Sequence, residues 1–276
     1  MRVLVTGAGG QLGHDVVAAF AAHDVIGADR AALDVSDRDA VLSAICGMQP
    51  DAIVHAGAWT AVDACEGDPD RAYAVNALGT RHVAEGARRA GAYLCYVSTD
   101  YVFDGTKDAA YIEWDTPNPR SVYGRSKLAG ESEIAAEHSV VRTSWVCGAN
   151  GKNFVKTMLR MASERDSWGV VDDQRGRPTF TPDLAAAIYK LVAGRLPGTF
   201  HLSNEGETTW YGFACAILEA AGLDASRIRP ITTADYPVPA PRPANSVLDN
   251  AAWRLSGFAP LPPWGPSLAR LIEEVG

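Results

Sequence analysis

The stretch that decides the fold reads Arg2-Val-Leu-Val-Thr6, followed by Gly7-Ala-Gly-Gly-Gln-Leu-Gly13. The first five residues form a largely apolar run typical of a buried strand, and an alanine-rich segment with helical spacing follows at 14–22. Glycines between a strand and a helix let the backbone turn tightly and approach a pyrophosphate, whose charge then lies at the helix N-terminus. The spacing is G-x-x-G-x-x-G with an additional glycine at Gly9, rather than G-x-G-x-x-G. This context predicts a dinucleotide-binding loop instead of a turn without a ligand.

Strands and helices continue to alternate along the first half of the chain. Apolar runs predict strands at 2–6, 24–29, 51–56, 92–98 and 139–145, with a further short strand at 199–203. Helical patterns predict helices at 14–22, 36–46, 69–90, 153–163 and 182–193, and Ser36 is the candidate cap of the second. Uninterrupted apolar runs separated by helices indicate a parallel sheet that is covered on both faces. The predicted fold class is α/β: a Rossmann-type doubly wound parallel sheet with a smaller, mostly C-terminal α/β substrate domain.

The pattern becomes less regular after Trp145, which indicates a division of the chain into two domains. We expect residues 1–146 to form an NAD(P)-binding domain, with a return segment near 168–203. Residues 147–167 and 204–276 would then form a substrate-binding domain. The proline-rich segment 235–243 is expected to be an ordered loop, because apolar and aromatic residues follow it.

The composition argues against several classes of function. A formal net charge of −8 disfavours sequence-independent binding to nucleic acid or to anionic membranes. The five cysteines are scattered and form no C-x-x-C, so we expect small buried hydrophobic side chains in a reducing compartment. The chain goes from Met1-Arg2 straight into a strand, and no apolar stretch approaches the ~20 residues of a membrane span. The expectation is a cytoplasmic protein without a signal peptide.

The end of the second predicted strand bears on the choice of cofactor. Asp29 lies there, where an acid accepts hydrogen bonds from the adenosine ribose hydroxyls and favours NAD. Arg30 follows directly and could bind a 2′-phosphate, which favours NADP. An adenine ring could rest on Asp34-Val35 in the next loop. NADPH and NADH both remain open.

Candidate catalytic groups lie at the end of the fourth strand and on the helix that follows it. Tyr123 and Lys127 are four residues apart and share one helix face, where the lysine ammonium favours the phenolate and can hold a ribose. Ser98-Thr99-Asp100 ends the fourth strand, at the edge of an open α/β sheet where ligands bind. A hydroxyl there could hydrogen-bond a substrate carbonyl while Tyr123 protonates it. The order of glycine loop, Ser-Thr and Y-x-x-x-K predicts carbonyl reduction beside a nicotinamide.

With these motifs the chain resembles the extended short-chain dehydrogenase/reductase family, and within it the reductases of nucleotide-linked deoxysugars. The resemblance runs through nearly the whole chain, and its most specific parts are Ser98-Thr-Asp-Tyr-Val-Phe103 and Asp173-Gln-Arg-Gly-Arg-Pro-Thr179. The other motifs that carry it are Gly7–Gly13, Ala58-Trp-Thr-Ala-Val-Asp63, Tyr123-Gly-Arg-Ser-Lys-Leu-Ala-Gly-Glu131, Arg142-Thr-Ser-Trp145 and Arg242-Pro-Ala-Asn-Ser-Val-Leu-Asp249.

The resemblance implies a role for individual positions of this sequence. Thr99, Tyr123 and Lys127 would be the catalytic triad. The cofactor would be bound by Tyr123 and Lys127 together with Gly7, Gly10, Gln11, Leu12, Gly13, Asp29, Arg30, Asp34, Val35, Gly57, Ala58 and Trp59. The sugar nucleotide would be bound by Thr99, Asp100, Tyr101 and Trp145, with Asn153, Arg175 and Arg242 as candidates for its diphosphate.

The implied activity is the NAD(P)H-dependent reduction of the C4 keto group of a dTDP-linked 6-deoxy sugar. Some members of the family are magnesium-dependent dimers with glutamates near the first helix, where this chain carries His14-Asp15. No metal site is therefore predicted, Mg²⁺ stays an open question, and both a monomer and a homodimer are compatible with the sequence. Three alternatives remain: a 4-ketoreductase for another deoxysugar, an epimerase, and a non-catalytic regulatory subunit similar to that of methionine adenosyltransferase.

Overall fold

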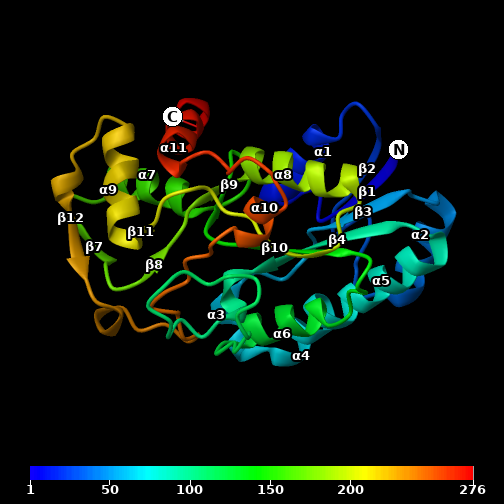
Figure 1. The fold of residues 1–276 in the computed structure, drawn as a ribbon. Helices are drawn as coiled ribbons and strands as arrows, with labels where there is room; N and C mark the ends of the chain where they lie inside the picture. Colours follow the sequence, from blue (N-terminus) through cyan, green and yellow to red (C-terminus); the bar gives the residue numbers. More distant parts are fainter. Residues whose placement is uncertain (276) are drawn as a thin grey trace.

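The centre of the molecule is a six-stranded parallel sheet with the strand order β10-β5-β4-β3-β1-β2. The computed structural model describes residues 1–275, and Figure 1 shows the sheet between two layers of helices. The strands of this sheet are β1 (Arg2–Thr6), β2 (Asp24–Ala28), β3 (Ala52–His55), β4 (Tyr93–Thr99), β5 (Ser139–Thr143) and β10 (Gly198–His201). All six predicted strands are present, and the predicted fold class is confirmed.

Side chains alternate between the two faces of the sheet, and each face has its own hydrophobic core. Val3 and Val5 of β1 pack with helices α1 (Gln11–Ala19) and α8 (Thr181–Gly194). Leu4, between them in the strand, packs with α2 (Arg38–Met48) and α5 (Gly79–Ala90) on the opposite face. This alternation is the period of two that a strand imposes on its side chains, and it accounts for uninterrupted apolar runs in strands that are buried on both sides.

The predicted helix at 69–90 is a chain of three helical segments. It begins as α4 (Pro69–Tyr73), passes through the π-helical turn η1 (Ala74–Leu78), and continues as α5. The wide turn contains Asn76, whose amide accepts a hydrogen bond from the backbone N–H of Trp59 (2.8 Å) and donates to the carbonyl of Trp59 (3.1 Å) and to Ser126 Oγ (3.0 Å). Asn76 thereby connects the loop after β3 with the helix α6 (Val122–Glu131).

Two expected helix starts differ from the structure. Helix α1 begins at Gln11, directly after the glycine loop and earlier than the predicted residue 14. The prediction was late because glycine has a low helix propensity, and Gly13 nevertheless lies inside this helix. Ser36 is not the cap of α2: its hydroxyl donates to Asp34 Oδ1 (2.7 Å) within a turn. Asp37 caps this helix instead, and its carboxylate accepts from the N–H of Ala40 (3.0 Å).

Apart from the two cores of the sheet, a separate hydrophobic cluster, called the second cluster below, lies beyond one end of the sheet. Its elements are at the left of Figure 1. It combines helices α7 (Phe154–Glu164), α9 (Trp210–Ala220) and α11 (Trp264–Val275). Three short strand pairs accompany them: β6 (Val146–Cys147) with β9 (Thr179–Phe180), β7 (Trp168–Val171) with β12 (Ile228–Ile231), and β8 (Arg175–Gly176) with β11 (Thr208–Thr209). The remaining elements are α3 (Val62–Gly67), α10 (Ala251–Leu255) and the 3-10 turns η2 (Asp100–Val102), η3 (Ala225–Arg227) and η4 (Thr233–Asp235).

The position of two segments bears on the division into domains. Trp168 and Val170 of β7, which the sequence assigned to the return segment of the first domain, pack in the second cluster. Trp253 of α10, assigned to the second domain, packs in the core of the central sheet with α8. We propose that the return segment begins at α8, and that α10 also belongs to the nucleotide-binding domain.

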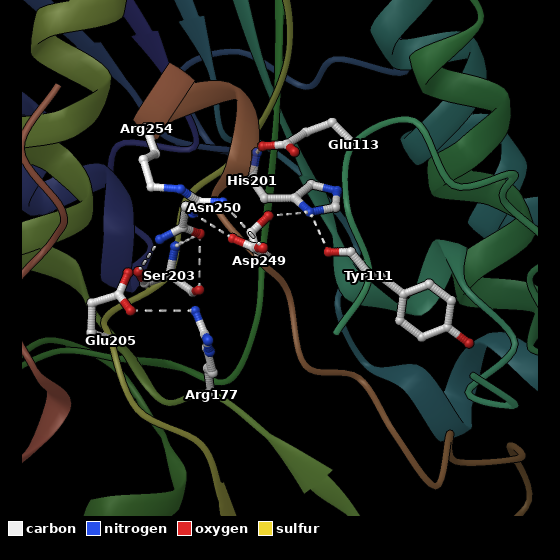
Figure 2. A network of polar contacts seen from close by, with 9 residues as sticks. All are labelled: Tyr111, Glu113, Arg177, His201, Ser203, Glu205, Asp249, Asn250 and Arg254. Atoms are coloured by element: carbon white, nitrogen blue, oxygen red, sulfur yellow. Dashed lines mark hydrogen bonds and ion pairs between the residues drawn. The ribbon is translucent and has the colours of Figure 1, made fainter. Parts of the chain in front are cut away.

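A buried polar network fixes the edge of the sheet at β10 (Figure 2). His201 Nδ1 lies 3.0 Å from the carbonyl of Tyr111 and 3.2 Å from that of Asp249, and its backbone N–H donates to Glu113 (2.8 Å). Asn250 exchanges hydrogen bonds with Ser203 in the same network. These contacts attach the segments 111–113 and 249–250, which are distant in sequence, to the end of β10, the neighbour of β5 in the sheet. Among residues 1–275, no helix is long and apolar enough to cross a bilayer.

Candidate active site

A cavity of about 710 Å³ lies at the carboxyl edge of the sheet, where β1, β3, β4 and β5 end. Its lining includes every residue that was predicted to bind the cofactor and all three predicted catalytic residues. Parallel strands place their carboxyl ends at one edge, so residues more than a hundred positions apart meet there. Thr99, Asp100, Tyr101 and Trp145, predicted to bind the substrate, line the same cavity.

The glycine loop is built to bring backbone N–H groups close to a ligand. Gly7 has a φ of 71°, and a Cβ atom at this position would lie 2.7 Å from the backbone of Gly57. A Cβ atom at Gly13 would lie 2.2 Å from the carbonyl oxygen of Gly7, so only glycine lets α1 start against the loop. Gly10 caps α1 without a side-chain hydrogen bond, which leaves the first N–H groups of the helix available to an anion.

The residues expected to bind the adenosine part of the cofactor line the cavity, and their positions do not decide between NAD and NADP. Asp29 Oδ1 accepts a hydrogen bond from the N–H of Ala32 (2.9 Å), and its other oxygen makes no such contact to the turn. Arg30 is 3.6 Å from Asp34 and mostly exposed, and both residues line the cavity. Hydrogen bonds from the Ser36 hydroxyl and N–H hold the pKa of Asp34 below its usual value. The site therefore offers both a ribose acceptor and a cation that can reach a 2′-phosphate.

Helix α6 presents the predicted tyrosine and lysine to the cavity. Ser121 caps it by accepting from the N–H of Gly124 (3.0 Å), and Glu66 of α3 accepts from the N–H of Val122 (2.7 Å). Lys127 Nζ donates to the carbonyl of Val97 (2.7 Å) and lies 4.1 Å from the ring centroid of Tyr96. Only 2% of Lys127 is exposed, and this burial lowers its pKa to about 7, against a raising effect of Glu131.

Tyr123 is protonated in the environment that the protein alone provides. Burial raises the pKa of its phenol far above the ordinary value, and the Thr99 hydroxyl opposes this shift only in part. Lys127, which was expected to lower this pKa, is not among the groups that shift it, and its Nζ donates to the carbonyl of Val97 instead. A protonated phenol is the form that can give a proton to a carbonyl oxygen.

Two stacked indoles form an apolar wall of the cavity. The ring centroids of Trp145 and Trp210 are 3.5 Å apart, and their planes are inclined by 8°. Trp145 has a left-handed φ of 48°, uncommon for a bulky residue and a conformation that concentrates at functional sites. A Cβ atom at Gly176 would lie 2.3 Å from the Trp145 ring, so the strand β8 approaches this ring closely because glycine occupies that position.

Three predicted diphosphate residues are engaged elsewhere and do not line the cavity. Asn153 caps α7 and donates to Gln11 Oε1 (3.0 Å), so it contacts the glycine loop indirectly. Arg175 donates to the carbonyl of Asp108 (2.8 Å). Arg242 forms an ion pair with Asp63 (2.8 Å), and its guanidinium lies 6.0 Å from the ring centroid of Tyr101.

The cavity also contains residues that the sequence did not single out. Thr143 and Ser144 line it at the end of β5, and their position in the last residues of a predicted strand could have indicated this. Arg71 lines it from α4, with its guanidinium 4.4 Å from the ring centroid of Trp59. Trp210 lies at the start of α9, and no local pattern relates it to the first half of the chain.

The residues at the cavity fit a dinucleotide, whereas the part of the chain that the structure describes has no comparable site for a metal. Free helix N–H groups, close glycines and a desolvated lysine together suit a pyrophosphate and a ribose. Within residues 1–275, no group of three or more His, Cys, Asp or Glu side chains could hold a metal ion. His14 is exposed on α1 and belongs to no such group.

The parallel sheet, the glycine loop at α1 and the Tyr123–Lys127 pair at one cavity define a Rossmann-type short-chain dehydrogenase/reductase. The protein-family model described as RmlD substrate binding domain matches residues 1–276, and the chain belongs to this family.

Comparison with known proteins gives relatives over nearly the whole chain. The chain is 42% identical over 280 residues to dTDP-4-dehydrorhamnose reductase of Streptomyces griseus, covering 97% of this chain and 91% of the relative. It is 40% identical over 286 residues to a probable dTDP-4,6-dihydroxy-2-methyloxan-3-one 4-ketoreductase of Streptomyces antibioticus, covering 100% and 96%. The crystal structure of dTDP-4-dehydrorhamnose reductase from Bacillus anthracis in complex with NADP is similar with a TM-score of 0.95, at 39% identity and 99% coverage of both chains.

Proposed function

We propose that this chain is a dTDP-4-dehydrorhamnose reductase, which uses NADPH or NADH to reduce the C4 keto group of dTDP-4-dehydro-6-deoxy-L-mannose to dTDP-L-rhamnose. The observation that carries the proposal is that Thr99, Tyr123 and Lys127 line one cavity with the glycine loop. The relatives from Streptomyces griseus and Bacillus anthracis carry this name, and the latter is bound to NADP.

The residues of the chain divide the work of the reduction. When bound, the nicotinamide supplies the hydride that forms the new C–H bond at C4. Tyr123 gives its phenol proton to the C4 oxygen, and Thr99 donates a hydrogen bond to the same oxygen. Lys127 holds the nicotinamide ribose and places a positive charge beside the phenolate that results. Because Thr99, Tyr123 and Lys127 are each less than 10% exposed, little water competes for these hydrogen bonds.

The rest of the sugar nucleotide requires contacts with the second cluster. Tyr101 and the Trp145–Trp210 pair would contact the sugar or its base, and Asp100 lies next to Thr99 at the cavity. Asn153, Arg175 and Arg242 remain candidates for the diphosphate. Arg242 would bind it by exchanging its ion pair with Asp63 for a phosphate, which an arginine can bind through two parallel hydrogen bonds. We also propose a cytoplasmic location, without direct binding of nucleic acid or membrane, and a monomeric or homodimeric state.

The test of the catalytic assignment is removal of a single hydroxyl. In an assay of NADPH and NADH oxidation with dTDP-4-dehydro-6-deoxy-L-mannose, Tyr123→Phe should lower kcat by ~10²–10⁴-fold, because the proton donor is lost. The Kd of the cofactor should stay the same. Tyr189→Phe is the matched control, since it removes a phenol hydroxyl from α8 at the His23 contact, away from the cavity. Full activity of Tyr123→Phe would exclude the assignment.

A second candidate keeps the chemistry and changes the sugar. It is a 4-ketoreductase for another dTDP-linked deoxysugar, and it is favoured by the Streptomyces antibioticus relative at 40% identity. The two candidates are separated by kcat/KM for the two keto sugars, measured with both cofactors and with and without Mg²⁺. An epimerase would act without net oxidation of NAD(P)H, and a regulatory subunit would show no turnover and would co-purify with a larger enzyme.

A further inference from the structure

The Thr99 hydroxyl has its single proton committed to a neighbouring carboxyl group. Thr99 Oγ1 accepts a hydrogen bond from the N–H of Tyr101 (3.2 Å) and donates to Asp100 Oδ1 (2.9 Å). A hydroxyl has one proton and two lone pairs. In this arrangement it has no proton left for a substrate carbonyl, although the reduction requires one.

A protonated Asp100 resolves this conflict without moving an atom heavier than hydrogen. If the carboxyl group carries the proton of the 2.9 Å contact, Thr99 Oγ1 accepts two hydrogen bonds, from Asp100 and from the N–H of Tyr101. Both of its lone pairs are then used, and its own proton is free to point into the cavity. If Asp100 is ionised and Thr99 turns its proton to a substrate, a lone pair of Thr99 Oγ1 faces the carboxylate of Asp100, and the two repel each other.

The surroundings of Asp100 favour the neutral form. Only 2% of the residue is exposed, and Oδ2 is buried without a partner of hydrogen-bond geometry. An ionised carboxylate in such a place would lose its hydration, and Oδ2 would gain no hydrogen bond in return. Burial raises the pKa of Asp100 to about 6, against the hydroxyls of Ser246 and Thr99 and backbone N–H groups, which lower it.

The main causes of this shift are burial and hydrogen bonds rather than the charge of a neighbouring side chain. Ser246 faces the carboxyl group from the 245–247 segment, but its hydroxyl donates to the carbonyl of Arg175 (3.4 Å). The phenols of Tyr101 on η2 and Tyr123 on α6 are the neighbouring titratable groups, and burial keeps both protonated. The Arg242–Asp63 pair acts on the phenol of Tyr101.

We propose that Asp100 is a positioning residue: its protonated carboxyl group donates to Thr99 Oγ1 and so turns the Thr99 hydroxyl toward the carbonyl oxygen of the substrate. The inference rests on the proposed function, since it concerns the donor to the carbonyl that is reduced. It predicts a reductase whose kcat falls as pH rises and Asp100 ionises, while the substrate KM changes little.

The decisive variant is Asp100→Asn, because a carboxamide has nearly the same shape and its N–H₂ group donates at every pH. We expect this variant to keep kcat near the value that the wild type has at low pH, and to lose the decline of kcat that follows from the ionisation of Asp100. Asp100→Ala removes the donor, and its kcat should fall toward that of Thr99→Val, which lacks the carbonyl donor altogether, a loss of ~10²–10³-fold. In a Thr99→Val background, neither substitution at Asp100 should have a further effect on kcat.

A second measurement does not depend on turnover. Infrared difference spectra recorded across a pH titration of the unliganded protein should contain the band of a protonated buried carboxyl group, which Asp100→Asn removes. Thermal unfolding of each variant shows whether it is folded.

The proposal is overturned if folded Asp100→Asn loses as much activity as Thr99→Val, or keeps the pH dependence of the wild type. It is also overturned if Asp100→Ala is fully active, or if Asp100→Asn changes only KM, which would indicate direct substrate binding. If wild-type protein reduces no keto sugar, the proposed function fails, whereas the infrared titration still reports on the protonation of Asp100.

Discussion

At the scale of single residues, the charge of Lys127 depends on a buried chain of contacts behind it. Lys127 and Glu131 lie four residues apart on α6, and the carboxylate of Glu131 is the group that raises the pKa of this lysine. Glu131 is held by Arg142 of β5 (2.7 Å) and by the hydroxyl of Ser98 of β4 (2.5 Å). Ser98 and Arg142 are cross-strand neighbours, so the sheet itself fixes the position of the carboxylate.

We predict that cofactor affinity falls as the pH rises through about 7, the value to which burial lowers the pKa of Lys127. Below this pH the ammonium is charged and can hold the ribose; above it the charge is lost. The Kd of NADH should rise by up to about tenfold per pH unit, because above this pH Lys127 must take up one proton when NADH binds. Fluorescence titration with NADH measures this, and NADH is preferred because it lacks a 2′-phosphate that titrates near pH ~6.

Glu131→Gln should move this midpoint to lower pH, since it removes the charge that raises the pKa of Lys127. Glu133→Gln is the matched control: Glu133 pairs with Arg81 (2.8 Å) at the surface, and its removal should leave the midpoint unchanged. Equal behaviour of the two variants would argue against a role of Glu131 in the charge of Lys127.

At the scale of elements, two glycines show how closely the helices on one face of the sheet approach each other. A Cβ atom at Gly86 of α5 would lie 2.6 Å from Cδ1 and 3.2 Å from Cβ of Ile45 on α2. A Cβ atom at Gly47 of α2 would have no neighbouring atom within 4 Å. Both glycines lie inside helices, where this residue type lowers stability. The close packing of α2 and α5 therefore explains why position 86 is a glycine, whereas no contact explains the glycine at position 47.

We predict opposite effects of alanine at these two positions. Gly47→Ala should raise the free energy of unfolding by about 0.5–1 kcal/mol, because alanine loses less backbone entropy in a helix. Gly86→Ala should lower it by about 1–3 kcal/mol, because α2 and α5 must separate or Ile45 must change its rotamer. Urea unfolding followed by circular dichroism measures both, and each variant serves as the control of the other. Changes of the same sign would contradict the described α2–α5 packing.

At the scale of the whole molecule, buried histidines make stability depend on pH. His201 is fully buried in the network of Figure 2, and burial together with the charge of Arg142 lowers its pKa to about 3. The unfolded chain binds this proton near pH 6.5, so between about 3 and 6.5 it carries more protons than the folded one. Stability from His201 is therefore complete above pH 6.5 and is lost as the pH falls.

We predict that the wild type loses stability relative to His201→Gln as the pH falls from 6.5 to 5, with a slope that approaches about 1.4 kcal/mol per pH unit. The comparison with a variant removes the contribution of buried carboxyl groups such as Asp100, which has the opposite sign. His14→Gln, at an exposed position of α1, should give a curve parallel to that of the wild type. Urea unfolding at several pH values provides the data. A constant difference between wild type and His201→Gln would contradict the neutral state of His201.

The sequence by itself determined the central sheet, the glycine loop and the edge where the cofactor and catalytic residues meet. Apolar runs and helical spacing are local signals, and parallel strands bring their carboxyl ends together whatever the details of packing. Thr99, Tyr123 and Lys127 could therefore be assigned to one site before their distances were known. The helix starts at 11 and 38 were missed because they depend on loop contacts, those of Gly13 and Asp37.

Only the tertiary structure decided which side chains are free and in which protonation state they act. β7 pairs with β12, and Trp145 stacks on Trp210, across about 60 residues of chain that carry no shared period. The engagement of Arg242 with Asp63 and the buried, unpartnered oxygen of Asp100 depend equally on partners distant in sequence. Charge and hydrogen-bond state follow from burial and from such partners. A local motif such as Ser98-Thr-Asp100 therefore predicts which groups lie at this site but does not predict their protonation states.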